Sequence, residues 1–333
     1  MLTGILIAAA ASTGAAPAPL KTFSDWVVAC DNGRACQAVG LQREDDVDGL
    51  TLLVRRGAER GAVAEVRVAL TSGTPVAVGV DGKRLAVRVS VSDGEAVIDP
   101  LDMAAFIAAI RNGRQIDMIN ASGATFARAS LSGASAALLY MDDKQGRVGT
   151  ITALVKPGGK SAAAVPAPPA LPVIVSPPPT RAKPRQISKA QADAELKPLE
   201  CGPDGPNDFK TEHYRLDARS SLALLPWPCG NGAYNYFSNA VIVEETGRAV
   251  RAKFEVDPGM GEENDGTVVN ANWDIKTRLL TSFAKGRGVG DCGTINSYAW
   301  DGRMFRLVRQ ETMDECRGSV DYITTWRARV VQR

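Results

Sequence analysis

The sequence predicts a mainly β protein with two antiparallel β-rich domains joined by a proline-rich linker. Short runs that alternate between apolar and polar residues, separated by glycine and aspartate turns, fill both ends of the chain. Nine of the 19 prolines fall within residues 156–190. No heptad repeat and no repeated βαβ unit interrupts this pattern. We therefore expect an N-terminal domain over 19–155, a linker over 156–190 and a C-terminal domain over 191–333.

The chain opens with a short apolar run that ends in small residues, Thr13 to Ala16. Such a run is typical of a secretory signal, so residues 1–18 are predicted to be a signal peptide that is cut near Ala15. The alternative is an ordinary buried strand. The run is too short to cross a bilayer, and no other segment approaches that length. We expect a periplasmic or secreted bacterial protein with no transmembrane segment.

The N-terminal domain is predicted to be sandwich-like and to contain two helices. One helix should start after Asp99, which can cap it, with Pro100 at its first position, and should end near Gly113. The other should start after Ser132 and end at Gly146. The expected strands lie at 26–29, 50–54, 63–70 and 85–91.

The predicted linker cannot bury a core and favours an extended, semi-rigid polyproline geometry. It is basic and holds no acidic residue, whereas the whole chain has a net charge of only +2. Its charge either contacts anionic envelope polymers or merely keeps the segment soluble. We expect it to impose no fixed angle between the domains. The small net charge also argues against a nucleic-acid partner.

The C-terminal domain is predicted to be an aromatic-rich sheet domain, because 14 of the 19 aromatic residues lie beyond residue 190. Its expected strands lie at 234–243, 249–256, 279–284, 295–300, 304–308 and 322–330. The Asp-Gly dipeptide at 301–302 predicts a two-residue hairpin that pairs Trp300 with Arg303. One face, belonging either to the core or to a recognition surface, should then carry Tyr298, Trp300, Phe305 and Leu307.

An even number of cysteines in a chain that is expected to be exported argues for disulfides. Sequence alone leaves the connectivity open, but the spacing favours Cys30–Cys36, Cys201–Cys229 and Cys292–Cys316. The first pair brackets an Asn-Gly turn signal, and the other four cysteines all lie beyond the linker. A metal site would need clustered Cys and His ligands, whereas no CxxC occurs and His213 is the sole histidine. No metal or other cofactor is predicted.

Several motifs resemble a known family. In the first half they are Phe23 to Cys30 with Cys36, and Ser130 to Asp143 followed by Gln145 to Arg147. In the second half they are 228–235, 286–293, 298–302 and 316–318. Both sets are similar to the secreted bacterial family called domain of unknown function 1176 (DUF1176). Two segments of the first set, Trp26 to Cys30 and Ser132 to Leu138, also resemble the invasion-associated locus B family of periplasmic proteins, and this match is confined to the N-terminal domain. These resemblances imply an envelope location and supply no catalytic residues.

No residue pattern identifies a reaction, and no catalytic residue is predicted. The segment 288–293 fits G-x-G-x-x-G, but neither a following helix nor a βαβ unit surrounds it. A Ser-His-Asp arrangement would have to use His213, next to Glu212 and Tyr214. A lone histidine of this kind is more often a satisfied polar residue.

The best candidate binding surface surrounds the predicted Cys292–Cys316 bridge. The bridge would bring together three polar side chains, those of Arg287, Asp291 and Arg317. Guanidinium groups suit carboxylates and phosphates, although an Arg–Asp pair that only fixes the loop is the alternative. The aromatic side chains of Tyr298 and Trp300 complete the set of predicted binding residues.

The sequence favours a non-enzymatic envelope protein that binds or scaffolds an envelope component, either a protein or an anionic polymer. One alternative is a secreted hydrolase acting on cell-wall polymer, which a cleft with two converging carboxylates would favour. The other is an inhibitor of a lytic enzyme, which a protruding disulfide-braced loop would favour.

Overall fold

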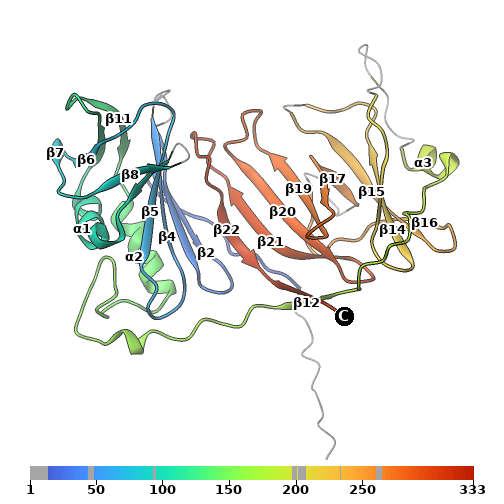
Figure 1. Ribbon diagram of the computed structural model, residues 1–333, viewed down its shortest axis with the longest axis horizontal. Helices are drawn as coiled ribbons and strands as arrows, with labels where there is room; N and C mark the ends of the chain where they lie inside the picture. The colour runs from blue at the N-terminus through green and yellow to red at the C-terminus, as the bar shows by residue number, and fades with distance from the viewer. Residues whose placement is uncertain are drawn as a thin grey trace, which may run out of the picture.

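The two ends of the chain form β-rich units that lie side by side, as Figure 1 shows. The computed structural model describes residues 14–43, 49–92, 95–196, 201, 208–232, 234–259 and 265–333. Most of the predicted signal peptide therefore lies outside the described residues. Among the residues that are described, no helix is long and apolar enough to cross a membrane.

The N-terminal unit contains a seven-stranded antiparallel sheet. Its strand order is β1 (Lys21–Phe23), β2 (Trp26–Cys30), β3 (Cys36–Gly40), β4 (Leu50–Arg56), β5 (Ala64–Leu70), β9 (Glu95–Ile98) and β8 (Val89–Ser92). A four-stranded sheet has the order β11 (Thr125–Ser130), β10 (Gln115–Ile119), β6 (Ala77–Val80) and β7 (Lys83–Arg84). Of the strand expected at 85–91, only residues 89–91 form a strand, as part of β8.

Both predicted helices of this unit are confirmed. After a single 3-10 turn, η1 (Pro100–Asp102), the first continues as α1 (Met103–Asn112), and the Asp99 carboxylate accepts a hydrogen bond from the Leu101 amide at 2.8 Å. The second is α2 (Ala134–Lys144), which begins at Gly133. Both helices and the small sheet pack on one face of the large sheet and bury one hydrophobic core.

The C-terminal unit is a sandwich of two further sheets. One holds β13 (Glu212–Arg215), β14 (Ser220–Pro226), β15 (Phe237–Glu244) and β16 (Ala249–Arg251), with β17 (Thr267–Val269) paired to β15. The other has the order β18 (Asn272–Asp274), β19 (Leu279–Lys285), β20 (Gly293–Trp300), β21 (Phe305–Met313) and β22 (Ile323–Arg327). An aromatic-rich core lies between them. The helix α3 (Lys189–Leu196) covers the outer face of β14 and β15.

The predicted hairpin register at 301–302 is wrong by two residues, whereas the predicted face is correct. Trp300 pairs with Phe305 rather than Arg303, because the loop is four residues long and the Asp301 carboxylate accepts hydrogen bonds from the amides of Arg303 and Met304, each at 2.8 Å. A shift of two residues keeps each side chain on its side of the sheet. Four side chains therefore still share the buried face: Tyr298, Trp300, Phe305 and Leu307.

Residues 156–190 are fixed to both units along their length, and we call them the strap. Figure 1 shows the strap in light green beneath both units. Its strand β12 (Val173–Ser176) pairs in parallel with the C-terminal strand β23 (Arg329–Gln332). Val165 is completely buried, and its carbonyl accepts a hydrogen bond from Arg60 at 2.8 Å. The expectation of a free spacer is therefore wrong, because backbone pairing supplies contacts that composition does not reveal.

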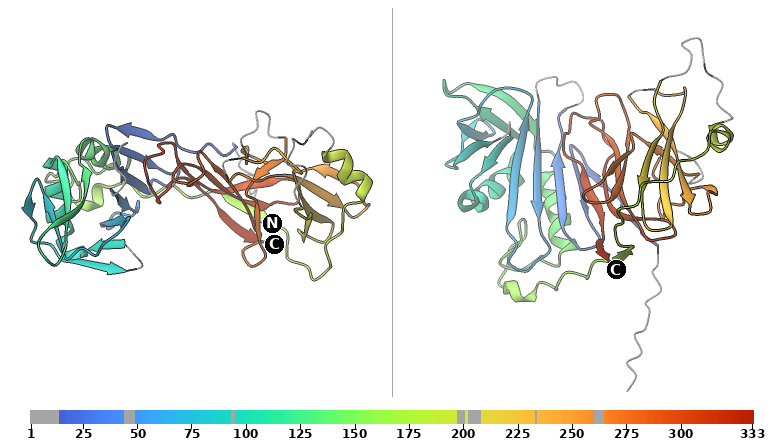
Figure 2. Two further views of the ribbon diagram at one scale, coloured as in Figure 1. Left: turned by 90° about the horizontal axis from the view of Figure 1, so that it is seen from above. Right: turned by 45° about the vertical axis from the view of Figure 1, so that its right-hand side comes forward.

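The units also touch each other directly through a hydrophobic cluster. Val27, Val39 and Leu53 project from the large N-terminal sheet toward Met313 and Ile323 of the C-terminal unit. Figure 2 shows the elongated molecule that results, with the two units in a row. Both faces of β2 are covered as a consequence. Whether each unit folds alone stays a prediction.

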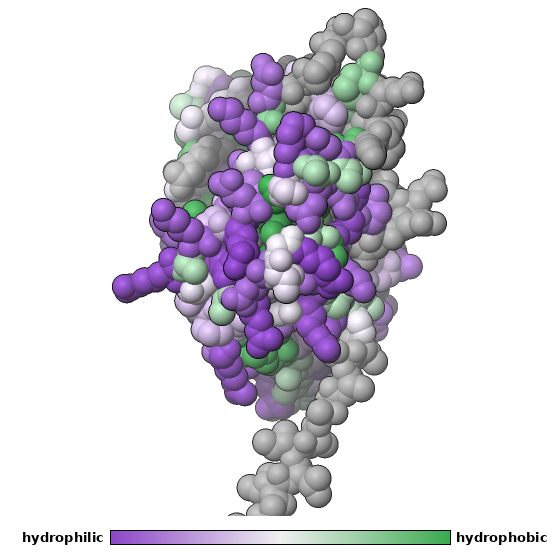
Figure 3. Space-filling model, turned by 90° about the vertical axis from the view of Figure 1, so that its right-hand side faces the viewer, coloured by the Kyte–Doolittle hydropathy of each residue, from purple (hydrophilic) through white to green (hydrophobic). Residues whose placement is uncertain are grey.

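The surface at the end of the molecule that carries α3 is mainly hydrophilic. Figure 3 shows charged and polar residues there, with only small apolar islands between them. Scattered apolar side chains are normal on a soluble protein surface. The described residues of this end therefore form no broad apolar face in this view.

Candidate functional site

All three predicted disulfides are present: Cys30–Cys36, Cys201–Cys229 and Cys292–Cys316. The last one ties the segment after Arg287 and Asp291 to the segment before Arg317 and Gly318. Arg287 donates to both carboxylate oxygens of Asp291, at 2.7 and 2.5 Å, and the Gly318 amide donates to Asp291 at 2.7 Å. The hydrogen bond from Arg287 holds the pKa of Asp291 below its usual range. The pair thus braces the loop across the bridge.

Arg317 lies in the same region, but its side chain points elsewhere. Its guanidinium donates to the Asp25 carboxylate at 2.7 Å and to the Gln42 carbonyl at 2.8 Å, both in the N-terminal unit. The side chain is only 12% exposed. The predicted trio with Arg287 and Asp291 therefore does not form as one surface, because Arg317 joins the two units.

The two aromatic candidates belong to the core of the C-terminal unit. Tyr298 is fully buried and donates to the Val256 carbonyl at 2.9 Å, while Trp300 is 3% exposed and donates to the Asp217 carboxylate at 2.7 Å. Burial raises the pKa of the Tyr298 hydroxyl. As neither ring reaches the surface, the prediction that they bind a partner is not compatible with this fold.

His213 also has a structural role. It lies on β13, and its Nε2 accepts a hydrogen bond from the Ile187 amide of the strap at 3.2 Å. Burial lowers its pKa. In the described part of the chain, no group of three His, Cys, Asp or Glu side chains is arranged to hold a metal ion.

The disulfide hairpin between β2 and β3 is one of the places where the two units meet. Cys30 and Cys36 are directly paired across the strands, and the Asp31 carboxylate accepts the amides of Gly33 and Ala35, at 2.8 and 3.0 Å. The residue with left-handed backbone in the turn is Arg34, with φ of 62°, and not the glycine of the Asn-Gly signal. Asp31 also forms an ion pair with Arg327 of the C-terminal unit.

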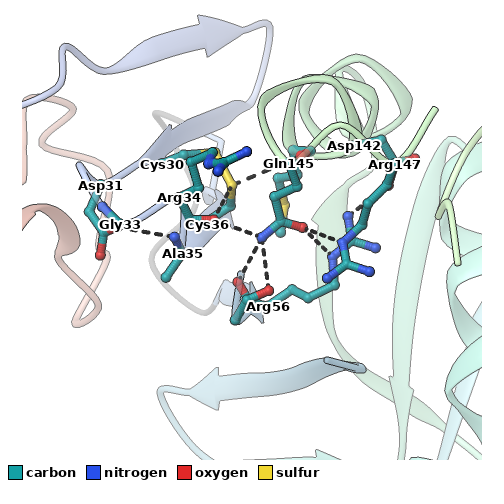
Figure 4. Close-up of a disulfide and its surroundings, with 12 residues drawn as sticks. Cys30, Asp31, Gly33, Arg34, Ala35, Cys36, Arg56, Asp142, Gln145 and Arg147 are labelled. Carbon is teal, nitrogen blue, oxygen red and sulfur yellow. Dashed lines mark hydrogen bonds and ion pairs between the residues drawn. A yellow bond between two sulfur atoms is a disulfide. The ribbon is translucent and has the colours of Figure 1, made fainter. Parts of the chain in front are cut away.

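A buried polar network supports this hairpin from behind, as Figure 4 shows. The Gln145 amide donates to the carbonyls of Arg34, Arg56 and Gly57 at 3.0–3.1 Å. Its carbonyl accepts hydrogen bonds from Arg56 and Arg147, at 2.7 and 3.0 Å. The Gln145 side chain therefore bridges the hairpin, β4 and the end of α2.

One carboxylate, that of Asp142, offsets part of the positive charge of the two arginines in this network. Asp142 pairs with Arg56 at 2.7 Å, and their side chains are 0% and 1% exposed. Burial lowers the pKa of the Arg56 and Arg147 guanidinium groups. Asp142 also accepts the amides of Leu154 and Val155, at 2.8 and 2.9 Å. Buried charges of this kind hold their surroundings in one arrangement when every partner is present.

A polar groove lies in front of the hairpin, between the two units, and we call it the arginine groove. Its volume is about 260 Å³, and four arginines and two acidic residues line it. Three of the guanidinium groups are partly exposed, at 47%, 50% and 39% of the side chain: Arg55, Arg309 and Arg327. Each is paired with a carboxylate, namely Glu65 at 2.6 Å, Glu311 at 2.8 Å and Asp31.

The sequence does not predict the arginine groove because its residues come from five separate strands. Arg55 is on β4, Arg309 on β21 and Arg327 on β22. Nothing in their spacing links them. One local signal does exist, since residues 26–30 are apolar without alternation, which indicates a strand buried on both faces and hence a second packing partner.

The fold and its bridges define a disulfide-braced β protein of two units with a polar groove between them. The chain belongs to the family described as protein of unknown function (DUF1176), whose sequence model matches residues 20–329. It is similar to the uncharacterized protein YpfG of Escherichia coli K12, with 33% identity over 344 residues, which covers 95% of this chain and 94% of that protein. No solved structure matches it. The resemblance to the invasion-associated locus B family stays a prediction.

Proposed function

We propose that this is an exported, non-enzymatic binding protein that holds an anionic component of the bacterial envelope in the arginine groove. The observation that carries this proposal is the gathering of Arg55, Arg309 and Arg327, all partly exposed, in one hollow between the units. Ligand sites occur preferentially at such domain interfaces. The three disulfides and the apolar N-terminal run support export.

The chemistry of the groove suits a carboxylate or phosphate group. A guanidinium presents a planar fork of donors that matches both. The existing pairs Arg55–Glu65 and Arg309–Glu311 are about half exposed, and exposed ion pairs contribute only about 0–1 kcal/mol. An incoming anion can therefore take over these donors at little cost in folding free energy.

The acidic residues of the groove favour binding over hydrolysis. The Asp31 side chain is completely buried and is held by Arg327 and by the amides of Gly33 and Ala35. Glu65 is 58% exposed and accepts a hydrogen bond from Arg55 at 2.7 Å. Hydrolysis of a glycosidic bond generally uses two carboxyl groups that flank it, whereas only Glu65 of these two is open to solvent. The hydrolase and inhibitor alternatives stay predictions.

The test is a titration with butyl phosphate followed by the NMR shifts of backbone amides. Shifts are expected around Gln37, Arg309 and Thr324, and they should weaken as salt is raised. The double substitution Arg55→Gln and Arg309→Gln should abolish them, whereas Arg303→Gln, at an exposed arginine on the 301–304 loop, should not. Shifts that map to another surface, or that survive the double substitution, would contradict the proposal.

A further inference from the structure

A second groove adjoins the first and has the opposite character. We call it the apolar groove; it has a volume of about 500 Å³, within the range of small-molecule sites. Met103 and Ile107 of α1 are buried at its base. Three apolar side chains at the same groove remain open to solvent, Val63, Leu101 and Ile151, which are 70%, 83% and 64% exposed.

Exposed apolar side chains are ordinary when scattered and informative when they gather on one hollow. The cluster here lies on three separate segments, before β5, in η1 and after α2, so the fold rather than a local run brings it together. Burying each such side chain is worth roughly 1.5–3 kcal/mol. The groove is therefore a place where a hydrocarbon group gains free energy by leaving water.

The wall of the apolar groove is built in advance by the buried network. Arg111 donates to the carbonyls of Leu154 and Val155, at 2.8 and 3.1 Å, and Asp142 accepts the amides of the same two residues. Arg56 donates to the Thr152 carbonyl at 3.1 Å. These contacts fix the segment 152–155 in place. A preformed wall lowers the entropic cost of binding.

The charged residues at the apolar groove are basic. Among the described residues that line it, Arg56 and Arg111 are charged and none is acidic. The two grooves are adjacent, because Val63 and Arg56 line both of them. A hydrocarbon chain that lies against Leu101 and Ile107 therefore has one end next to the arginine groove.

We propose that the ligand of this protein is an anionic single-chain amphiphile, with its hydrocarbon chain in the apolar groove and its charged head in the arginine groove. This proposal rests on the proposed function and adds the chemical class of the ligand. It follows from the position of the solvent-open apolar groove directly beside the arginine groove, with which it shares part of its wall.

Calorimetric titration of the full chain with butyl, octyl and dodecyl phosphate, below the concentrations at which they form micelles, tests the proposal. Affinity should rise with chain length by up to about fourfold per methylene group that becomes buried. In the double variant Leu101→Asn and Ile151→Asn, octyl and dodecyl phosphate should bind no more tightly than butyl phosphate. Ile275→Asn, at a 74% exposed apolar residue in the turn after β18, is the matched control and should change nothing.

The variants separate this proposal from the proposed function. Arg55→Gln with Arg309→Gln should weaken all three phosphates by the same factor. If butyl phosphate binds the wild type as tightly as dodecyl phosphate does, the amphiphile is wrong and the anion site survives. If octanol binds as tightly as octyl phosphate, the phosphate group adds nothing to the affinity, and both proposals fail. Dimerisation in sedimentation velocity that Leu101→Asn with Ile151→Asn abolishes would assign the groove to a second copy and overturn the amphiphile.

Discussion

Gln145 is the residue on which the N-terminal half of the site depends. Its single side chain satisfies three backbone carbonyls and two guanidinium groups, and it is 1% exposed. In the sequence, only the family resemblance of residues 145–147 points to this region. Its physical reason, two buried arginines beside one carboxylate, is visible only when β4 and α2 are brought together, because Arg56 lies 86 positions from Asp142.

Asp142→Asn should strongly destabilise the protein. The change removes the negative charge from a buried cluster and leaves Arg56 and Arg147 uncompensated, which typically costs about 3–5 kcal/mol. Asp143→Asn is the matched control, because Asp143 is the exposed neighbour on the same helix. Urea unfolding of both variants measures the difference. Equal unfolding free energies of the two variants would show that the Asp142 carboxylate does not stabilise the buried arginines.

Arg317→Ala should lower the melting temperature more than Arg287→Ala. Arg317 is largely buried and its loss leaves Asp25 without its guanidinium partner across the interface, whereas Arg287 is 51% exposed. Exposed ion pairs contribute about 0–1 kcal/mol. Arg303→Ala serves as the control for loss of an exposed arginine. A larger loss for Arg287→Ala would contradict the structural role given to Arg317.

The contribution of the Arg287–Asp291 pair should depend on pH. The pKa of Asp291 is lowered in the folded protein by the hydrogen bond from Arg287. The pair therefore stabilises the fold above the unfolded carboxyl pKa of about 4, and the effect is lost as the pH falls through the lowered value. The difference in melting temperature between wild type and Arg287→Ala should be present at pH 7 and shrink toward zero on acidification. A difference that grows in acid would have the wrong sign.

At the scale of elements, the sequence predicts α1, α2 and about half of the described strands, but it misses β3, β10 and β14 among others, and it does not show how the strands are paired. The Asp99 cap and the start of α2 follow from local chemistry that involves only neighbouring residues. The register between β20 and β21 does not, because the side chain of Asp301 stabilises a four-residue loop where the dipeptide favours two. The predicted buried face is still correct, because a shift by an even number of residues keeps each side chain on the same side of the sheet.

Gly133, at the start of α2, is a position that tolerates no side chain. It has φ of 94° where α2 begins, and a Cβ there would lie 1.7 Å from the Phe23 carbonyl oxygen. Gly133→Ala should therefore cost well over ~1 kcal/mol, since both backbone strain and a clash with β1 arise. Gly159→Ala, where the Cβ would meet nothing within 4 Å, should leave thermal stability nearly unchanged. Similar melting temperatures for the two variants would refute this placement of α2.

At the scale of the whole molecule, the strap and the interface cluster hold the two units together. A proline-rich composition predicts an extended chain correctly, but it cannot show that β12 finds a partner in β23 at the far end of the sequence. The interface is equally non-local, because Val27 and Ile323 are almost 300 positions apart. The candidate site belongs to this scale. The sequence therefore directed attention to the disulfide loop at 286–291, where the residues are close along the chain.

The arginine groove exists only if the two units keep a fixed arrangement, and this is the central claim. It is tested most directly by pulsed electron spin resonance between labels at Lys83→Cys and Lys276→Cys, two exposed positions in different units. A protein held by the strap and the interface cluster should give one narrow distance distribution. A broad distribution, as a free proline-rich tether would produce, would contradict the claim and remove the groove as a binding site.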